Sequence, residues 1–178
     1  MSANDTQDGV YIYNNTIANP MQCWSASQRT TADPARCLFI QGDMENFYCQ
    51  NNVFYEIGAS GGYLLGFLEP LISGSVDYNV YWKVNGGNYI YYDGYDIDYS
   101  AFASYQSGSG EDAYSVAANP SFRANTLIPQ PASPAVNTGI ALPDVLVDYT
   151  GLPRPQGGIY DKGGYEVPFI DALQLSGD

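Results

Sequence analysis

Five side chains in the first half of the sequence could bind a sugar chain: Tyr11, Tyr13, Tyr48, Gln50 and Asp77. The flat face of a tyrosine ring stacks on the apolar C–H face of a sugar, and neighbouring amides and carboxylates bond to the sugar hydroxyls. On neighbouring strands, ~4.8 Å apart, such residues would form a ladder along a groove. The residue types therefore predict contact with a polysaccharide through an outward, tyrosine-bearing face.

The candidate residues lie in three short runs of alternating β-branched and aromatic residues, and each run contains an asparagine turn. The runs cover residues 10–17, 47–55 and 74–82. Alternation followed by asparagine is typical of a strand that enters a tight turn, because asparagine tolerates the left-handed conformation. Asn15, Asn52 and Asn79 are 37 and then 27 residues apart, within the ~20–50 residues of a solenoid repeat. The spacing therefore predicts stacked coils.

In register, those coils would place Ile12, Cys49 and Val76 in one dry column. Successive residues of a strand point to opposite faces, so the opposite face would carry the five candidate residues together with Ser75. One face is then apolar in every coil and the other is polar and aromatic, which favours this register over a slip by one residue. In an alternative interpretation, the later residues 83–166 cover the tyrosines.

The composition favours a β-rich, loop-rich fold. The chain has 178 residues, of which 45% are hydrophobic and 15% aromatic, with 17 tyrosines. Its 19 glycines and 11 prolines punctuate the sequence, and long runs of helix formers are nearly absent. Further strands are expected at residues 37–40 and 63–68, and residues 99–106 form the one plausible short helix. The length suits one domain with a sizeable core.

The charge pattern excludes some partners. The formal net charge is −13, with six Lys and Arg residues and no His. Nucleic acid is not expected, because no cationic surface is available to displace counterions from phosphates. A polyanionic glycan would be repelled unless calcium mediated the contact. Residues 93–98 offer oxygen ligands but lack the spacing of a helix–loop–helix calcium site, so no cofactor is expected and calcium is a weak candidate.

The sequence shows no signal peptide and no stretch of transmembrane length. No membrane partner is expected, and the chain is either intracellular or begins after a removed segment. Three cysteines, Cys23, Cys37 and Cys49, leave at least one unpaired. The sequence allows two alternatives, a disulfide bridge between Cys23 and Cys37 or three free thiols. The cysteine spacing fits no zinc motif, and histidine is absent.

Several later segments are similar to motifs of one protein family. They include residues 77–82 (DYNVYW), 131–139 (PASPAVNTG), 148–151 (DYTG) and 161–166 (DKGGYE). The second is similar to an SPA-D-G segment and the last to a terminal DIGAYE motif, in which Lys162 and Gly164 replace the usual Ile and Ala. Together they resemble the C-terminal part of right-handed parallel β-helix proteins of the pectate-lyase-like type, over most of residues 10–166.

The resemblance implies an all-β fold, a right-handed parallel β-helix of few coils with an irregular C-terminal wrapping segment. Parallel β-helix coils would cover residues 1–82, the wrapping segment residues 83–166, and a tail residues 167–178. The resemblance also implies a secreted or cell-surface bacterial protein concerned with polysaccharides. No cap is visible at residues 1–9, so the open first coil would meet a second copy or belong to a longer parent chain.

Three functions remain open. The first is a secreted β-helix segment that contacts polysaccharide through its tyrosine-bearing face. The second is the C-terminal part of a polysaccharide lyase or glycoside hydrolase with catalytic coils upstream. No catalytic residue is assigned. A glycoside hydrolase needs two carboxylates, and Asp77 is the only outward carboxylate on the aligned strands. A lyase needs a base, and the basic residues Arg154 and Lys162 are expected to be structural. The third is a structural piece of a surface or phage-associated fibre.

Overall fold

The protein folds as a stack of coils, each built from three short strands. The computed structural model describes residues 6–18, 36–56, 63–98 and 100–168. The first coil contains β1 (Gln7–Tyr13), β2 (Thr16–Ala18) and β3 (Arg36–Ile40), the second β4 (Met44–Gln50), β5 (Val53–Glu56) and β6 (Tyr63–Phe67), and the third β7 (Gly74–Asp77), β8 (Val80–Lys83) and β9 (Asn88–Tyr92). After them come β10 (Tyr95–Asp98), α1 (Phe102–Ser109) and β11 (Val116–Ala117).

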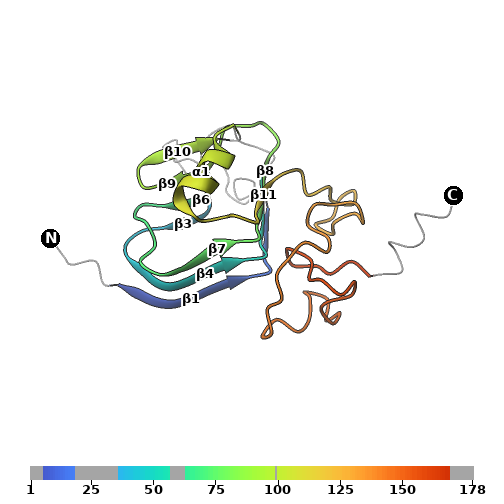
Figure 1. Cartoon of the computed structure of the whole chain (residues 1–178). Helices are drawn as coiled ribbons and strands as arrows, with labels where there is room; N and C mark the ends of the chain where they lie inside the picture. Colours follow the sequence, from blue (N-terminus) through green and yellow to red (C-terminus); the bar gives the residue numbers. More distant parts are fainter. Residues whose placement is uncertain (1–5, 19–35, 57–62, 99, 169–178) are drawn as a thin grey trace, which may run out of the picture.

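Equivalent strands of successive coils pair into three sheets (Figure 1). Sheet A has the order β1-β4-β7, sheet B the order β11-β8-β5-β2 and sheet C the order β10-β9-β6-β3. The strands pair in parallel, apart from the antiparallel β9–β10 hairpin. The fold is therefore mainly β with stacked parallel sheets, a solenoid-like arrangement of the class that the sequence predicts. Among the described residues, no helix is long and apolar enough to cross a membrane.

The register within sheet A is the predicted one. Ile12 pairs with Cys49, and Cys49 pairs with Val76. Cys49 and Val76 are fully buried, whereas Tyr11 and Tyr48 pair on the opposite face. A shift of the pairing by one residue would turn the tyrosines inward and expose Ile12, Cys49 and Val76. Because burial of these three side chains stabilises the observed register, the tyrosines stay on the outer face.

An asparagine ladder joins the coils at the corner between sheets A and B. The backbone N–H of Asn15 donates to Asn52 Oδ1 at 2.9 Å, and that of Asn52 donates to Asn79 Oδ1 at 2.9 Å. The residues just before the first two rungs, Asn14 and Asn51, adopt left-handed φ values of 51° and 57°, which asparagine tolerates. Each rung satisfies polar groups whose burial without a partner costs about 1–3 kcal/mol.

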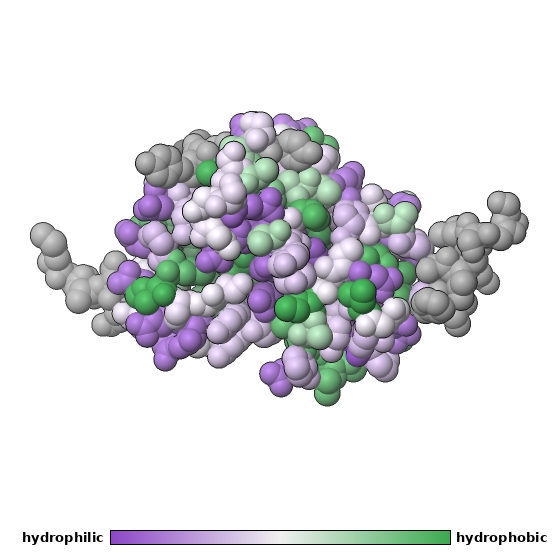
Figure 2. All heavy atoms as spheres, in the orientation of Figure 1, coloured by the Kyte–Doolittle hydropathy of each residue, from purple (hydrophilic) through white to green (hydrophobic). Residues whose placement is uncertain are grey.

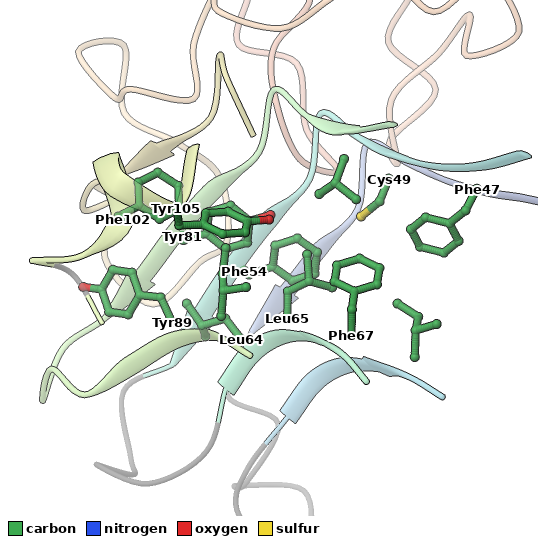
Figure 3. Close-up of a cluster of buried hydrophobic side chains, with 13 residues drawn as sticks. Phe47, Cys49, Phe54, Leu64, Leu65, Phe67, Tyr81, Tyr89, Phe102 and Tyr105 are labelled. Carbon is green, nitrogen blue, oxygen red and sulfur yellow. The ribbon is translucent and has the colours of Figure 1, made fainter. Parts of the chain in front are cut away.

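The hydrophobic core lies between the three sheets (Figure 3). Its inward side chains come from all three coils and from α1, and they include Phe47, Cys49, Phe54, Leu64, Leu65, Phe67, Tyr81, Tyr89, Phe102 and Tyr105. Phe54 of β5 stacks on Tyr81 of β8 with ring centroids 5.3 Å apart. Full burial of each large apolar side chain contributes about 1.5–3 kcal/mol, so the coils are held together mainly by this interior.

A buried carboxylate closes the asparagine ladder after the third coil. Asp112 accepts hydrogen bonds from the hydroxyls of Tyr81 at 3.0 Å, of Tyr105 at 3.1 Å and of Ser115. The backbone N–H of Asn79 donates in turn to Ser115 Oγ at 2.7 Å. Burial raises the pKa of Asp112 to about 7, even though these hydrogen bonds favour its charged form. Because Tyr105 belongs to α1, the carboxylate ties the helix to the third coil.

The C-terminal segment, residues 116–168, is irregular apart from β11 and lies beyond the C-terminal ends of the sheet A strands (Figure 1). It docks on the asparagine corner, where the side chain of Asn51 exchanges two hydrogen bonds with the backbone of Ile140, at 2.8 and 2.9 Å. A buried ion pair fixes its end, with Arg154 Nη1 2.7 Å from Glu166 Oε2. The predicted structural role of Arg154 is therefore confirmed.

Residues 83–115 contain more regular structure than the sequence predicts. β9 continues sheet C beside β6, and β10 folds back on β9 as a hairpin. Asp93 and Gly94 form its two-residue turn with φ values of 47° and 82°, as a type I′ hairpin requires. The expected helix is present but begins later, at Phe102, and Tyr99 lies outside the described residues.

Cys37 and Cys49 carry free thiols, and Cys23 lies outside the described residues. Burial raises the pKa of Cys37 to about 12 and also raises that of Cys49 well above its usual value. A thiol that stays protonated is a poor nucleophile and metal ligand. Both described cysteines therefore act as small packing residues, which is one of the two interpretations that the sequence leaves open.

Candidate functional site

Two of the predicted sugar-binding tyrosines stack on each other on the outer face of sheet A. Tyr11 of β1 and Tyr48 of β4 are register partners, with ring centroids 5.5 Å apart and planes 4° from parallel. Tyr13 tilts toward Tyr11, at a centroid distance of 5.8 Å and an interplanar angle of 60°. The structure thus brings three of the five predicted residues into one aromatic cluster, which we call the tyrosine face.

The tyrosine face is open to solvent. Tyr11 is 60% exposed, while Tyr13 and Tyr48 are half-buried. A separation of 5.5 Å between parallel ring centroids exceeds the ~3.5–4 Å contact distance of stacked carbon atoms, so rings in contact are offset and each leaves part of its face free. The later part of the chain leaves Tyr11 exposed, whereas at Tyr13 it lies beside the tyrosine face, as the alternative interpretation of the sequence expects.

Gln50 and Asp77 continue this outer face from β4 to β7. Tyr13 pairs with Gln50, and Gln50 pairs with Asp77. The half-buried Gln50 carries an amide that both donates and accepts hydrogen bonds. Asp77 is already engaged, because its Oδ1 accepts the backbone N–H groups of Tyr78 and Tyr114, both at 2.7 Å. Gln50 therefore suits a sugar hydroxyl, whereas Asp77 chiefly fixes the turn after β7.

Sequence reasoning missed a second stacked tyrosine pair, next to Asp77. The rings of Tyr78 and Tyr114 have centroids 5.0 Å apart and planes 15° from parallel. Lys162 Nζ lies 5.9 Å from the centre of the Tyr78 ring and donates to the carbonyl of Tyr114 at 3.2 Å. Burial lowers the pKa of Lys162 to about 8, although Asp77 and Asp112 favour its charged form. This pair and Lys162 fasten the C-terminal segment to the third coil.

The surroundings of Tyr13 raise the pKa of its hydroxyl above the ordinary value, so the group stays neutral over an even wider pH range. Burial raises its pKa, and the neighbouring Tyr11, Tyr48 and Asp144 raise it further. A neutral phenol can donate one hydrogen bond and accept others, which matches the hydroxyl groups of a sugar. The C-terminal segment approaches the tyrosine face at Tyr13, which lines one pocket together with Val145 and Val147.

The carboxylate that the structure brings near Asp77 is Glu111, which sequence reasoning did not name. Burial raises the pKa of Glu111, and Asp77 raises it further. Glu111 Oε2 accepts the backbone N–H of Val76 at 2.8 Å, just as Asp77 binds backbone N–H groups. Both carboxylates accept backbone N–H groups in or next to β7, and no catalytic residue is assigned here.

Within the described residues, no group of three or more His, Cys, Asp or Glu side chains is placed to hold a metal ion. In the acidic run that could offer calcium ligands, Asp93 forms the hairpin turn. Asp98 Oδ1 accepts hydrogen bonds from Ser100 Oγ at 2.7 Å and from the backbone N–H of Ala101 at 3.0 Å. These two carboxylates therefore shape the chain locally.

Comparison with known proteins assigns no relative to this chain. No family model, no curated protein and no solved structure matches it.

Proposed function

We propose that this chain binds a neutral polysaccharide through the tyrosine face, Gln50 and Asp77, as an extracellular or cell-surface module. The stacked pair of the exposed Tyr11 and the half-buried Tyr48 carries the proposal. Offset rings on successive coils offer successive apolar surfaces, and sugar rings in a chain present apolar C–H faces at intervals. Gln50 supplies an amide for the sugar hydroxyls. Asp77 fixes the turn after β7, at the end of this surface, by accepting the backbone N–H groups of Tyr78 and Tyr114.

The proposal includes the finer fold assignment, a right-handed parallel β-helix of the pectate-lyase-like type. It is supported by three strands per coil, by parallel pairing in all three sheets and by the asparagine ladder at one corner. A stack of this kind repeats its outer side chains at one strand spacing, ~4.8 Å. Such a regular row suits a ligand that is itself a repeating chain.

The ligand is expected to be neutral. The chain carries a net charge of −13, Asp77 lies next to Gln50 on the outer face, and the charge of Asp144 acts on Tyr13 by raising its pKa. An anionic glycan would be repelled by this field. On the face drawn in Figure 2, hydrophilic and hydrophobic residues alternate without one broad apolar area, a surface that suits a hydrated partner.

Calorimetric titration with soluble xylan, mixed-linkage glucan, glucomannan and polygalacturonate tests the proposal. We expect binding to at least one of the three neutral polymers, and weakening of about three- to tenfold in Tyr11→Ala and Tyr48→Ala, because an aromatic stack contributes ~0.5–1.5 kcal/mol. Tyr114→Ala is the matched control, since Tyr114 is 65% exposed and also stacked on a tyrosine but lies outside the tyrosine face. Absence of binding, or equal weakening in Tyr114→Ala, would refute the proposal.

A second candidate is end-to-end association of copies into a fibre-like assembly, favoured by the positions of β1, β2 and β3. Each of these strands is the last of its sheet at the same end of the stack, so the described part of the first coil offers three parallel edges. Edges of this kind pair readily with strands of another chain. Sedimentation velocity over a wide concentration range tests this, and a constant monomer coefficient rules it out.

A further inference from the structure

A pocket opens beside Tyr13, at the corner where β1 ends and β2 begins. It has a volume of about 530 Å³ and lies between this corner and the C-terminal segment. Its lining includes Tyr13, Asn15, Val147, Tyr149 and Tyr165, and we call it the corner pocket. Because Tyr13 belongs to both surfaces, the corner pocket is continuous with the tyrosine face. Its size falls in the range of small-molecule sites.

The walls of the corner pocket combine aromatic and aliphatic surface. Tyr149 is 81% exposed and meets Tyr165 edge to face, with ring centroids 5.7 Å apart and an interplanar angle of 62°. Val147, 51% exposed, adds an apolar side chain next to them. The exposed Tyr149 and the half-buried Tyr165, beside an aliphatic side chain, present both apolar ring surface and hydroxyls, the two kinds of contact that a sugar ring needs.

Asn15 gives the corner pocket a hydrogen-bond acceptor. In the ladder, the Oδ1 of Asn52 accepts the N–H of the preceding rung, Asn15, at 2.9 Å. Asn15 is the first rung, and its Nδ2 donates to Asn52 Oδ1 at 3.2 Å and to the carbonyl of Tyr13 at 2.9 Å. Its own Oδ1 receives no hydrogen bond from the described residues, and Asn15 is exposed. A ligand hydroxyl that enters the pocket therefore meets an acceptor.

The charged groups that line the corner pocket are already compensated. Arg154 is paired with Glu166 at 2.7 Å. Asp148 Oδ1 accepts the backbone N–H groups of Thr150 and Leu152 at 2.7 and 2.9 Å. A pocket whose charges are engaged within the fold favours a neutral ligand over an ionic one.

The corner pocket also continues on its other side. Leu127 and Tyr165 line both it and a second pocket of about 1040 Å³, which extends over the outer side of sheet B. There Tyr55 of β5 meets Phe122 edge to face, with ring centroids 5.2 Å apart. A path lined with aromatic residues thus runs from the tyrosine face, around the asparagine corner, toward sheet B.

We propose that the corner pocket is a subsite for a further sugar unit of the same neutral polysaccharide, so that the bound chain bends around the asparagine corner. This inference rests on the proposed function of the tyrosine face. It gives the C-terminal segment a binding role, because Tyr149 and Tyr165 come from it. It also makes affinity depend on ligand length, since a short oligosaccharide on the tyrosine face does not reach the pocket.

Calorimetric titration with cello-, xylo- and malto-oligosaccharides, from disaccharide to octasaccharide, tests the inference on the whole chain. We expect Tyr149→Ala to weaken the octasaccharide about three- to tenfold and to leave the shortest ligand that binds unchanged. Tyr11→Ala should weaken ligands of every length. Val147→Trp, which fills the pocket from an exposed position, should reproduce the effect of Tyr149→Ala, and Tyr114→Ala serves as the control.

The outcomes separate the two proposals. Binding that depends on Tyr11 but is indifferent to Tyr149→Ala and Val147→Trp at every length overturns the corner subsite and leaves the tyrosine face in place. If no oligosaccharide of any length binds although a neutral polymer does, the corner subsite falls, and if neither binds, both proposals fall. A length-dependent loss confined to the two pocket variants supports the bent path.

Discussion

Two pairs of stacked rings in this molecule share one geometry in opposite surroundings. Phe54 and Tyr81 lie in the interior, both fully buried, with ring centroids 5.3 Å apart and planes 8° from parallel. Tyr11 and Tyr48 lie outside, 5.5 Å apart and 4° from parallel, with Tyr11 60% exposed. Both pairs are register partners on adjacent parallel strands. The stacking distance therefore follows from the strand pairing, and by itself it does not mark a functional site.

The two pairs differ in what their hydroxyl groups contact. The hydroxyl of Tyr81 donates to Asp112 at 3.0 Å, so the fold uses both the ring and the polar tip. The hydroxyls of Tyr11 and Tyr48 make no hydrogen bond to the residues that the structure describes. A buried polar group must find a partner in the fold, whereas an exposed one remains available to a ligand. Exposure combined with an unused hydroxyl is what distinguishes the tyrosine face.

The largest expected difference is in stability. Tyr81→Ala should lower the free energy of unfolding by about 3–5 kcal/mol, because it leaves a cavity among fully buried neighbours. Tyr11→Ala should lower it by less than about 1 kcal/mol, as is usual for an exposed side chain. Urea unfolding followed by tyrosine fluorescence or circular dichroism measures both values.

The two variants are matched, because each removes one tyrosine from a stacked, in-register pair. The slope of unfolding free energy against urea should stay constant, which shows that the variants unfold from comparable states. Equal losses in the two variants would mean that the outer stack is as structural as the inner one, and the contrast between them would be wrong.

The second prediction concerns pH and the buried carboxylate beneath the inner stack. Burial raises the pKa of Asp112 to about 7 and that of Asp161 to about 6. As the pH falls from 7 to 5 the folded chain takes up these protons, while the unfolded chain, with a carboxyl pKa of ~3.9, remains largely deprotonated. Stability is therefore expected to rise as the pH falls from 7 to 5. Asp112 alone should contribute about 2 kcal/mol to that change.

Asp112→Asn isolates this contribution, because asparagine keeps an acceptor oxygen but does not titrate. Its unfolding free energy should depend less on pH between 5 and 7 than that of the unmodified chain, whatever its absolute value. Lys162, whose pKa burial lowers to about 8, stays charged in both states across this range. A stability that is flat or rises with pH in the unmodified chain would contradict the prediction.

The outer stack could be predicted from sequence, because every contact in it follows from a local pattern. Alternation along each strand assigns Tyr11 and Tyr48 to one face and Cys49 to the other, and asparagine marks where each strand ends. The β9–β10 hairpin was missed, although Asp93 and Gly94 between two tyrosines are a recognised hairpin signal. The same acidic residues also offer oxygen ligands, so their composition alone does not separate a turn from a cation site.

The corner pocket could not be predicted, because its walls meet through irregular chain. The side chain of Asn14 donates to the carbonyl of Asp161 at 2.8 Å, across 147 residues of sequence. No periodicity relates Tyr149 or Tyr165 to the coils, so their places depend on such individual contacts. The same holds for Asp112 and Tyr114, whose partners lie on strands some thirty residues earlier. Long-range contacts of irregular segments leave little local trace in a single sequence.

The smallest expected effect on stability comes from removing a single hydroxyl oxygen from one tyrosine of the inner or the outer stack. Tyr81→Phe keeps the inner stack and removes one donor to Asp112, so it should cost about 1–2 kcal/mol of unfolding free energy. Tyr48→Phe keeps the outer stack and removes a hydroxyl without a partner in the described fold, so its effect should stay within about 0.5 kcal/mol. Thermal or urea unfolding of the two variants under one condition measures the difference. Should Tyr48→Phe be as destabilising as Tyr81→Phe, the Tyr48 hydroxyl serves the fold and is not available to a sugar.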